Sequence, residues 1–124
     1  MMKSIPVWKQ ELSDGVHAAR LASLYCCAPA ETASEAARYA AVLDGLEKTF
    51  GSHAEAGLYS APGRTEIGGN HTDHQHGRVL AGSVNIDMIA AAAPNDKNQL
   101  RVQSEGYDLC VIDLNDLEAR KEEE

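Results

Sequence analysis

The chain has 124 residues and a formal net charge of −8, with 44% apolar and 24% charged residues. This length suits one domain with one modest core, and the composition is ordinary for a globular protein. Nucleic acids and membrane surfaces are polyanions that would repel a chain of this charge, so we expect neither as a partner.

The cysteines and the start of the chain bear on its compartment. The 3 cysteines, Cys26, Cys27 and Cys110, are odd in number and two are adjacent, which fits neither a disulfide framework nor a zinc motif. We therefore expect free thiols in a reducing environment. The opening residues, MMKSIPVWKQELSDG, lack the apolar run of a signal peptide. A cytoplasmic location is the expectation that follows.

The first half of the chain predicts helices. Apolar residues recur at three- and four-residue steps over Val7–Tyr25, which is the pattern of one amphipathic helix. Pro29 interrupts the pattern, and Thr32 or Ser34 can cap a second helix. Gly51 is placed to end that helix.

The second half of the chain predicts strands. Val84, Ile86 and Met88 alternate with polar residues, which is typical of a strand. Turn signals at residues 94–98 and 105–108 separate the last predicted strands, and strands joined by such short turns run antiparallel. The predicted strands cover residues 56–60, 79–90, 100–104 and 109–114.

Together these patterns predict an α+β fold, with two N-terminal helices packed on an antiparallel or mixed β-sheet. A helical segment covers residues 1–50 and a β-rich segment covers residues 51–124, and we expect both to form a single incomplete domain. Trp8 is expected in the core and His17 at the surface. The sheet should expose an apolar edge or face, which would allow the protein to dimerise.

One stretch, SAPGRTEIGGNHTDHQHG at residues 60–77, predicts neither a core-facing helix nor an ordinary strand. It contains no Gly-x-x-x-x-Gly-Lys-[Ser/Thr] phosphate loop and no Gly-x-Gly-x-x-Gly dinucleotide fingerprint. Its glycines and polar side chains leave three alternatives, which are a metal site, a sugar site and a plain loop.

The metal alternative depends on His71, His74 and His76, together with Asp73. Nitrogen and oxygen ligands suit zinc, but this spacing fits no common zinc motif. We therefore expect no metal at these residues.

The sugar alternative uses more of the stretch. Asp73 can accept two hydroxyl protons, Asn70 can both donate and accept, and His71 can do either. Gly68 and Gly69 would let the backbone approach a sugar ring closely. On these residues alone a plain loop remains equally open, because Asn70 and Asp73 also cap turns.

The longer segment APGRTEIGGNHTDHQHGRVLAGSVNID resembles the galactokinase signature of the GHMP kinase superfamily. In the family pattern, Pro-Gly-Arg precedes Asn-Leu-Ile-Gly-Glu-His-Thr-Asp, and an aromatic residue, a glycine and a Val-Leu strand follow. The resemblance covers about Leu43–Leu114. It implies part of the N-terminal domain of a GHMP kinase, and ATP-dependent phosphorylation of galactose, or a related hexose, at the anomeric hydroxyl.

The resemblance also implies roles for individual residues. Arg64 matches the catalytic-site arginine that lies beside an aspartate and the transferred phosphoryl group. His71 and Asp73 match residues that bind the sugar substrate. Asn70 stands where the family has a sugar-binding glutamate, and Glu66 stands where it has an asparagine. Glu66 is either an acid of the sugar site or a strand-side partner of an arginine such as Arg64.

The family implies ATP and Mg²⁺ as cofactors, but the main motifs that bind them are absent from this chain. It contains no loop of the type Pro-x-Gly-x-Gly-Leu-Ser-Ser-Ser. We therefore expect the sugar-binding portion of a kinase, with a small-molecule sugar as its ligand and no activity by itself. The alternative is a non-catalytic sugar-binding or regulatory relative, because Asn70 and Glu66 depart from the family pattern.

Overall fold

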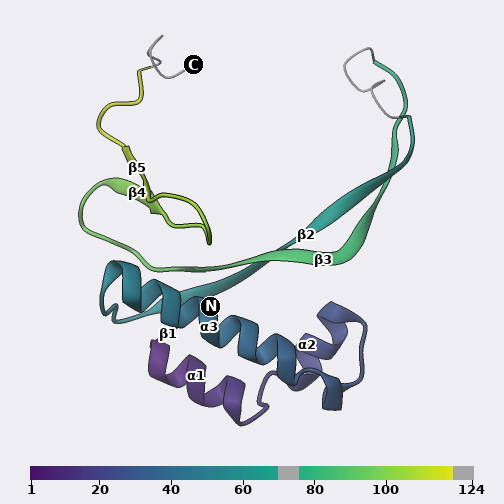
Figure 1. The fold of residues 1–124 in the computed structure, drawn as a ribbon, viewed down its shortest axis with the longest axis horizontal. Helices are drawn as coiled ribbons and strands as arrows, with labels where there is room; N and C mark the ends of the chain where they lie inside the picture. Colours follow the sequence, from purple (N-terminus) through teal and green to yellow (C-terminus); the bar gives the residue numbers. More distant parts are fainter. Residues whose placement is uncertain (70–75, 119–124) are drawn as a thin grey trace. The chain divides into compact units, whose positions relative to one another are not determined.

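The computed structural model describes residues 1–69 and 76–118, and the chain forms two compact units, residues 1–92 and 93–124. The first unit combines helices with a long β-ribbon (Figure 1). Its elements are β1 (Met2–Lys3), α1 (Ile5–Ser13), α2 (Ala18–Tyr25), the short 3₁₀ helix η1 (Pro29–Glu31), α3 (Ala33–Phe50), β2 (Ala56–Gly68) and β3 (Leu80–Ala92).

The second unit contains a two-stranded antiparallel sheet in its described residues. β4 (Gln99–Val102) pairs with β5 (Cys110–Asp113), in a register that runs from Gln99 opposite Asp113 to Val102 opposite Cys110. The strand pairings of both described sheets are antiparallel. The predicted α+β fold class is confirmed.

The helices differ from the prediction at one point. The sequence predicts one helix over Val7–Tyr25, but the structure divides this segment into α1 and α2, so the described residues contain three α-helices instead of two. The break includes Gly15, whose φ of 72° lies in the left-handed region that favours glycine. Apolar residues keep their helical spacing across the break, so the pattern alone does not reveal it.

α3 has the predicted boundaries, although Thr32 makes no side-chain capping hydrogen bond. It begins directly after Thr32 and ends directly before Gly51, whose φ is 84°. A glycine in this conformation ends a helix without the steric cost that a side chain would add.

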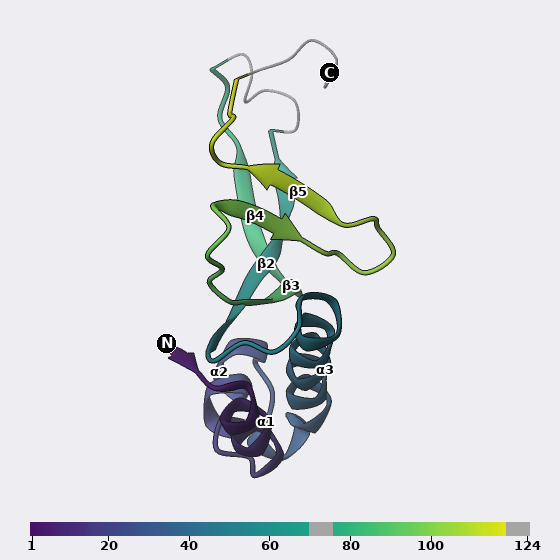
Figure 2. The same cartoon turned by 90° about the vertical axis from the view of Figure 1, so that its left-hand side faces the viewer.

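The core lies where α1 and α3 pack side by side and meet the start of the ribbon (Figure 2). Ile5 of α1 and Leu43 of α3 are fully buried, with exposed fractions of 1% and 0%. Trp8 is buried as well, and its indole N–H donates to the backbone oxygen of Ala56 at 2.8 Å. This bond joins α1 to β2 and confirms the prediction that Trp8 is a core residue.

A charged group joins β1 to α1 and to the turn that follows it. One carboxylate oxygen of Glu11 accepts a hydrogen bond from Lys3 Nζ at 2.5 Å and lies 2.7 Å from His17 Nε2. The His17 ring also packs on Trp8, with 5.3 Å between ring centroids. The predicted surface position of His17 holds only in part, because its side chain is 20% exposed and one face of its ring packs on the indole.

β2 and β3 form an antiparallel ribbon of 13 residues in each strand. The expectation that residues 60–77 form no ordinary strand is wrong for residues 61–68, because β2 continues to Gly68. Every residue of the segment Ala61–Gly68 is exposed. Polar residues and glycines are acceptable there because pairing with β3, and not burial, holds the strand.

The ribbon has an exposed apolar face. Tyr59, Ile86 and Met88 are each more than half exposed, and Met88 pairs with Ala61 across the ribbon. The predicted apolar face is therefore present in the described part of the sheet. Dimerisation through it stays a prediction.

Two further features concern the described chain as a whole. All three cysteines are free thiols, as the sequence predicts. None of the helices within residues 1–69 and 76–118 has the length and apolar character needed to cross a membrane.

The substitution Leu43→Ala should lower the free energy of unfolding by about 2–5 kcal/mol, because it removes a fully buried side chain and leaves a cavity. The matched control Leu24→Ala changes an exposed leucine of α2 and should have an effect of about 0.5 kcal/mol or less. Urea denaturation measures both values. Equal effects would contradict the position assigned to the core.

Hydrogen bonds from Lys3 and His17 hold the pKa of Glu11 below its ordinary value of 4.5. A lowered pKa stabilises the folded state above the unfolded pKa, and this contribution is lost as the pH falls through the folded value. Glu11→Gln should therefore lower the melting temperature at pH 7, and the gap to the unsubstituted protein should close below about pH 4. Glu55→Gln, which changes an exposed carboxylate, is the control. A gap that persists unchanged at pH 3 would refute the assignment.

Candidate functional site

Arg64 and Glu66 lie on β2, opposite Ser83 and Ala81 of β3. Residues two apart on a strand share a face, so the two side chains can meet. Arg64 Nη2 lies 3.5 Å from Glu66 Oε1, and the exposed side-chain fractions are 74% and 26%. An exposed pair at this distance contributes little energy. The guanidinium is therefore open to a second carboxylate or to an anion.

The backbone beside Arg64 is irregular, and Gly63 makes the irregularity possible. The ladder pairs Pro62 with Asp87 and then Arg64 with Ser83, so one residue of β2 faces three of β3. A Cβ added to Gly63 would lie 3.1 Å from Val84 Cγ2 and 3.2 Å from the backbone oxygen of Ile86. We call residues 83–87, with Gly63 opposite, the bulge.

Gly68 and Gly69, at the end of β2, differ from each other in their surroundings. A Cβ on Gly69 would lie 2.1 Å from the backbone oxygen of Arg78, and its φ is 86°. Gly69 therefore allows the two chain segments at the end of the ribbon to approach closely. Gly68 has no neighbouring atom within 4 Å of its Cβ position.

Apart from His76 of the metal alternative, which is described and exposed, the remaining candidate residues lie outside the described residues. They are Asn70, His71 and Asp73 of the predicted sugar site and His74 of the metal alternative. Among the residues that the structure describes, no group of three or more His, Cys, Asp or Glu side chains could hold a metal ion. The sugar-binding roles stay predictions.

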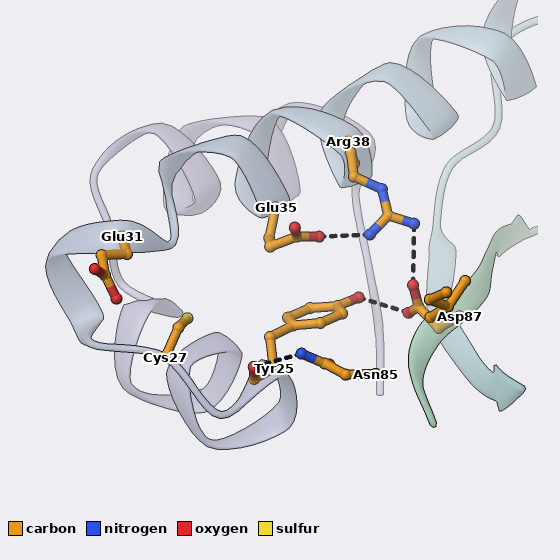
Figure 3. Close-up of a pocket in the computed structure, with 8 residues that line it drawn as sticks. Tyr25, Cys27, Glu31, Glu35, Arg38, Asn85 and Asp87 are labelled. Carbon is orange, nitrogen blue, oxygen red and sulfur yellow. Dashed lines mark hydrogen bonds and ion pairs between the residues drawn. The ribbon is translucent and has the colours of Figure 1, made fainter. Parts of the chain in front are cut away.

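A polar cluster that was not predicted from the sequence is centred on Asp87 (Figure 3). The Asp87 carboxylate accepts hydrogen bonds from Tyr25 Oη and Ser60 Oγ, each at 2.6 Å, and pairs with Arg38 Nη2 at 3.0 Å. Arg38 also bonds Glu35 one turn earlier on α3, at 2.5 Å. The ion pair of Glu35 with Arg38, three residues apart on α3, is the one part of the cluster that the local sequence indicates. Asp87 gives no such indication, because it fits the alternating pattern of an ordinary strand.

Burial and hydrogen bonding shift the pKa of Asp87 in opposite directions. Burial raises its pKa, but hydrogen bonds from Ser60, Tyr25 and Arg38 outweigh that effect and hold the pKa below its ordinary value. Burial, followed by the bond to Asp87, raises the pKa of Tyr25, so its hydroxyl remains a donor. The cluster therefore keeps one fixed arrangement of donors and acceptors across the neutral pH range.

A cavity of about 410 Å³ lies beside the cluster. Its lining includes neither Arg64 nor Glu66, and two of its acidic side chains, Glu35 and Asp87, are paired with Arg38. The lining residues are Tyr25, Cys27, Glu31, Glu35, Arg38, Asn85, Ile86 and Asp87.

Residues 46–94, which include all of β2 and β3, match a family model described as the galactokinase galactose-binding signature. This part of the chain is therefore similar to galactokinases. This confirms the resemblance drawn from the sequence, and it assigns the ribbon, the bulge and Arg64 to the signature.

Curated relatives agree with the signature. The chain is 35% identical over 83 residues to a galactokinase of Ligilactobacillus salivarius, a match that covers 64% of this chain and 21% of the relative. It is 33% identical over 74 residues to a galactokinase of Lacticaseibacillus casei, covering 59% and 19%. A galactokinase of Streptococcus suis is 34% identical over 71 residues, covering 55% and 18%. The chain thus spans about a fifth of the length of these relatives. No solved structure matches it.

Within the galactokinase signature, Gly63→Ala should lower the free energy of unfolding by about 1–3 kcal/mol, because the added Cβ presses on backbone of the bulge. Gly68→Ala, on the same strand, meets open space at a backbone conformation that other residues adopt. It should change the free energy of unfolding by about 0.5 kcal/mol or less. Urea denaturation of both variants tests the difference, and a tolerated Gly63→Ala would show that the bulge is not closely packed.

Proposed function

We propose that the natural full-length protein phosphorylates galactose, or a related hexose, at its anomeric hydroxyl with ATP. In this proposal the chain supplies the sugar-binding portion and Arg64. The observation that carries it is the match of residues 46–94 to the galactokinase galactose-binding signature. The three relatives named above, each called a galactokinase, support the same class of reaction.

The proposed sugar contacts come from the segment that follows β2 in the sequence. Asp73 accepts hydrogen bonds from ring hydroxyls, His71 contacts a further hydroxyl, and Asn70 both donates and accepts. A charged acceptor discriminates strongly among sugars, because an analogue without the hydroxyl leaves the charge unpaired. Glu66 joins these residues as an acceptor when Arg64 turns away from it.

Arg64 acts on charge in the proposed reaction. Its guanidinium is always charged and presents several N–H donors in a fixed plane. Placed beside a carboxylate, it holds that carboxylate ionised, and beside a phosphoryl group it stabilises negative charge that develops during transfer. Its 74% exposed side chain is free enough to reach such a partner.

The chain's own residues do not fit ATP and Mg²⁺. The sequence has no glycine-rich phosphate loop, and the described residues hold no cluster that could bind a metal. ATP supplies the phosphoryl group in the proposed reaction, and the steps assigned to this chain are limited to sugar binding and charge stabilisation.

A second candidate function is sugar binding without catalysis. The observation that favours it is the pairing of Arg64 with Glu66, at a position where the family pattern has an uncharged asparagine. A resident carboxylate competes with other partners for the guanidinium. The two functions differ in whether ATP is consumed.

The full-length protein should consume ATP with galactose and yield a sugar phosphate at the anomeric carbon, identified by phosphorus NMR. Arg64→Ala should lower kcat roughly 100-fold or more, because it removes charge stabilisation from the transition state. Arg20→Ala, which changes an exposed arginine of α2, is the matched control and should retain full activity.

The same assay separates the alternatives. Galactose binding without ATP consumption in the unsubstituted protein would establish the non-catalytic function, and an active Arg64→Ala variant would refute the role of Arg64. The 124-residue chain alone should show no turnover. Its galactose dissociation constant should be about millimolar or weaker, because a few solvent-exposed hydrogen bonds contribute about 0.5–1.5 kcal/mol each.

A further inference from the structure

At the bulge, contacts from other elements are needed to hold the ribbon backbone in position. Between the pairs Pro62–Asp87 and Arg64–Ser83, three residues of β3 face the single residue Gly63. Residues 84–86 of the bulge have no regular ladder partners, so the ladder alone does not fix their position. A shift in register there would also change the face on which Arg64 lies.

Two polar side chains of the bulge bond the end of α2. Asn85 Nδ2 donates to the backbone oxygen of Tyr25 at 3.0 Å, and Tyr25 Oη donates to Asp87 at 2.6 Å (Figure 3). The chain turns directly after Tyr25, where Cys26 has a left-handed φ of 53°. Carbonyl groups at a helix C-terminus lack partners within the helix, so Asn85 satisfies one of them.

Asp87 connects this contact to two more elements. Its side chain is only 6% exposed, and it bonds Ser60 of β2 and Arg38 of α3 as well as Tyr25 of α2. A buried carboxylate is stable only with such a full set of partners, so it resists displacement. The bulge is therefore fastened at two points, Asn85 and Asp87. The ladder pair of Asp87 with Pro62 is the one next to the pair of Arg64 with Ser83.

We propose that Asp87 and Asn85 are positioning residues, which hold the bulge against the end of α2 and thereby set the register and direction of Arg64. Neither residue touches substrate in this proposal. The catalytic part of the inference rests on the proposed kinase function, whereas the structural part, the fixing of the strand at Arg64, does not.

The structural part is tested without any activity. Backbone amide hydrogen exchange, followed by NMR, compares protected amides of residues 64–66 with those of residues 57–60, which lie on the other side of the bulge. Asp87→Asn should speed exchange at residues 64–66 roughly tenfold more than at residues 57–60, because local opening becomes easier beyond the bulge. Equal acceleration on both sides would overturn the proposal.

A smaller substitution distinguishes a local change in hydrogen exchange from general unfolding of the protein. Tyr25→Phe removes one hydroxyl and should produce the same pattern of exchange at a smaller size. Tyr59→Phe is its control, since Tyr59 lies on the exposed face of β2 and takes no part in the cluster. An identical exchange pattern in the two phenylalanine variants would also overturn the proposal.

The catalytic part needs a double-mutant cycle in the full-length protein with galactose and ATP. Asp87→Asn should lower kcat roughly tenfold or more with little change in KM for galactose, because a displacement of about 1 Å costs up to 100-fold in rate. If Asp87 acts through Arg64, the same substitution should change kcat less than about twofold in the Arg64→Ala background. Effects that multiply would mean a loss of folded protein and would overturn the positioning role.

The outcomes distinguish this proposal from the proposed function. If the unsubstituted protein phosphorylates no hexose, the kinase function fails, while a selective change in exchange at residues 64–66 still supports the positioning of the strand. If the protein is an active kinase and exchange at these residues is unaffected by Asp87→Asn, the positioning proposal fails and the kinase function stands.

Discussion

The buried carboxylate of Asp87 is the constraint on which the first unit depends, because it is where the helices and the ribbon are joined by charge. An isolated two-stranded ribbon is marginally stable in water, and this one is 13 residues long in each strand. Ala56 and Gly57 at its start are buried, whereas Ala61–Gly68 are exposed. Asp87 lies opposite Pro62, close to the boundary between these two parts.

That boundary explains why a binding signature includes residues with no evident ligand role. The matched region, residues 46–94, begins in α3 and includes both strands of the ribbon. A Cβ at Gly63 would make tight contacts with the bulge, and a Cβ at Gly69 would overlap the backbone oxygen of Arg78. An exposed strand that presents polar side chains has no core to hold it in place. The positions of its side chains must therefore be set by backbone geometry and by the bonds of the Asp87 cluster.

Features encoded locally were predictable, and features that depend on distant partners were not. α3 was predictable because Thr32 and Gly51 bound its apolar pattern, and β3 because its apolar residues alternate. The extension of β2 beyond Ser60 was not, because its hydrogen bonds come from a strand that follows in sequence. Arg64 was recognisable only through a family motif. Asp87 carried no local signal, since its partner Tyr25 lies 62 positions away.

The Arg64 guanidinium can pair with Glu66 and still bind another anion. A strong charge-assisted bond between nitrogen and a carboxylate oxygen is about 2.7–2.9 Å long. The Arg64–Glu66 distance of 3.5 Å is well beyond this, and Arg64 is largely in water. Separating the pair therefore loses little, while a carboxylate or phosphoryl group held in a drier site would bind the guanidinium more strongly. Glu66, in place of the asparagine of the family pattern, therefore holds the Arg64 side chain on one side without preventing Arg64 from binding another partner. This requires the backbone of β2 at Arg64 to be fixed. The fixed backbone, and not the ion pair, sets where Arg64 can reach.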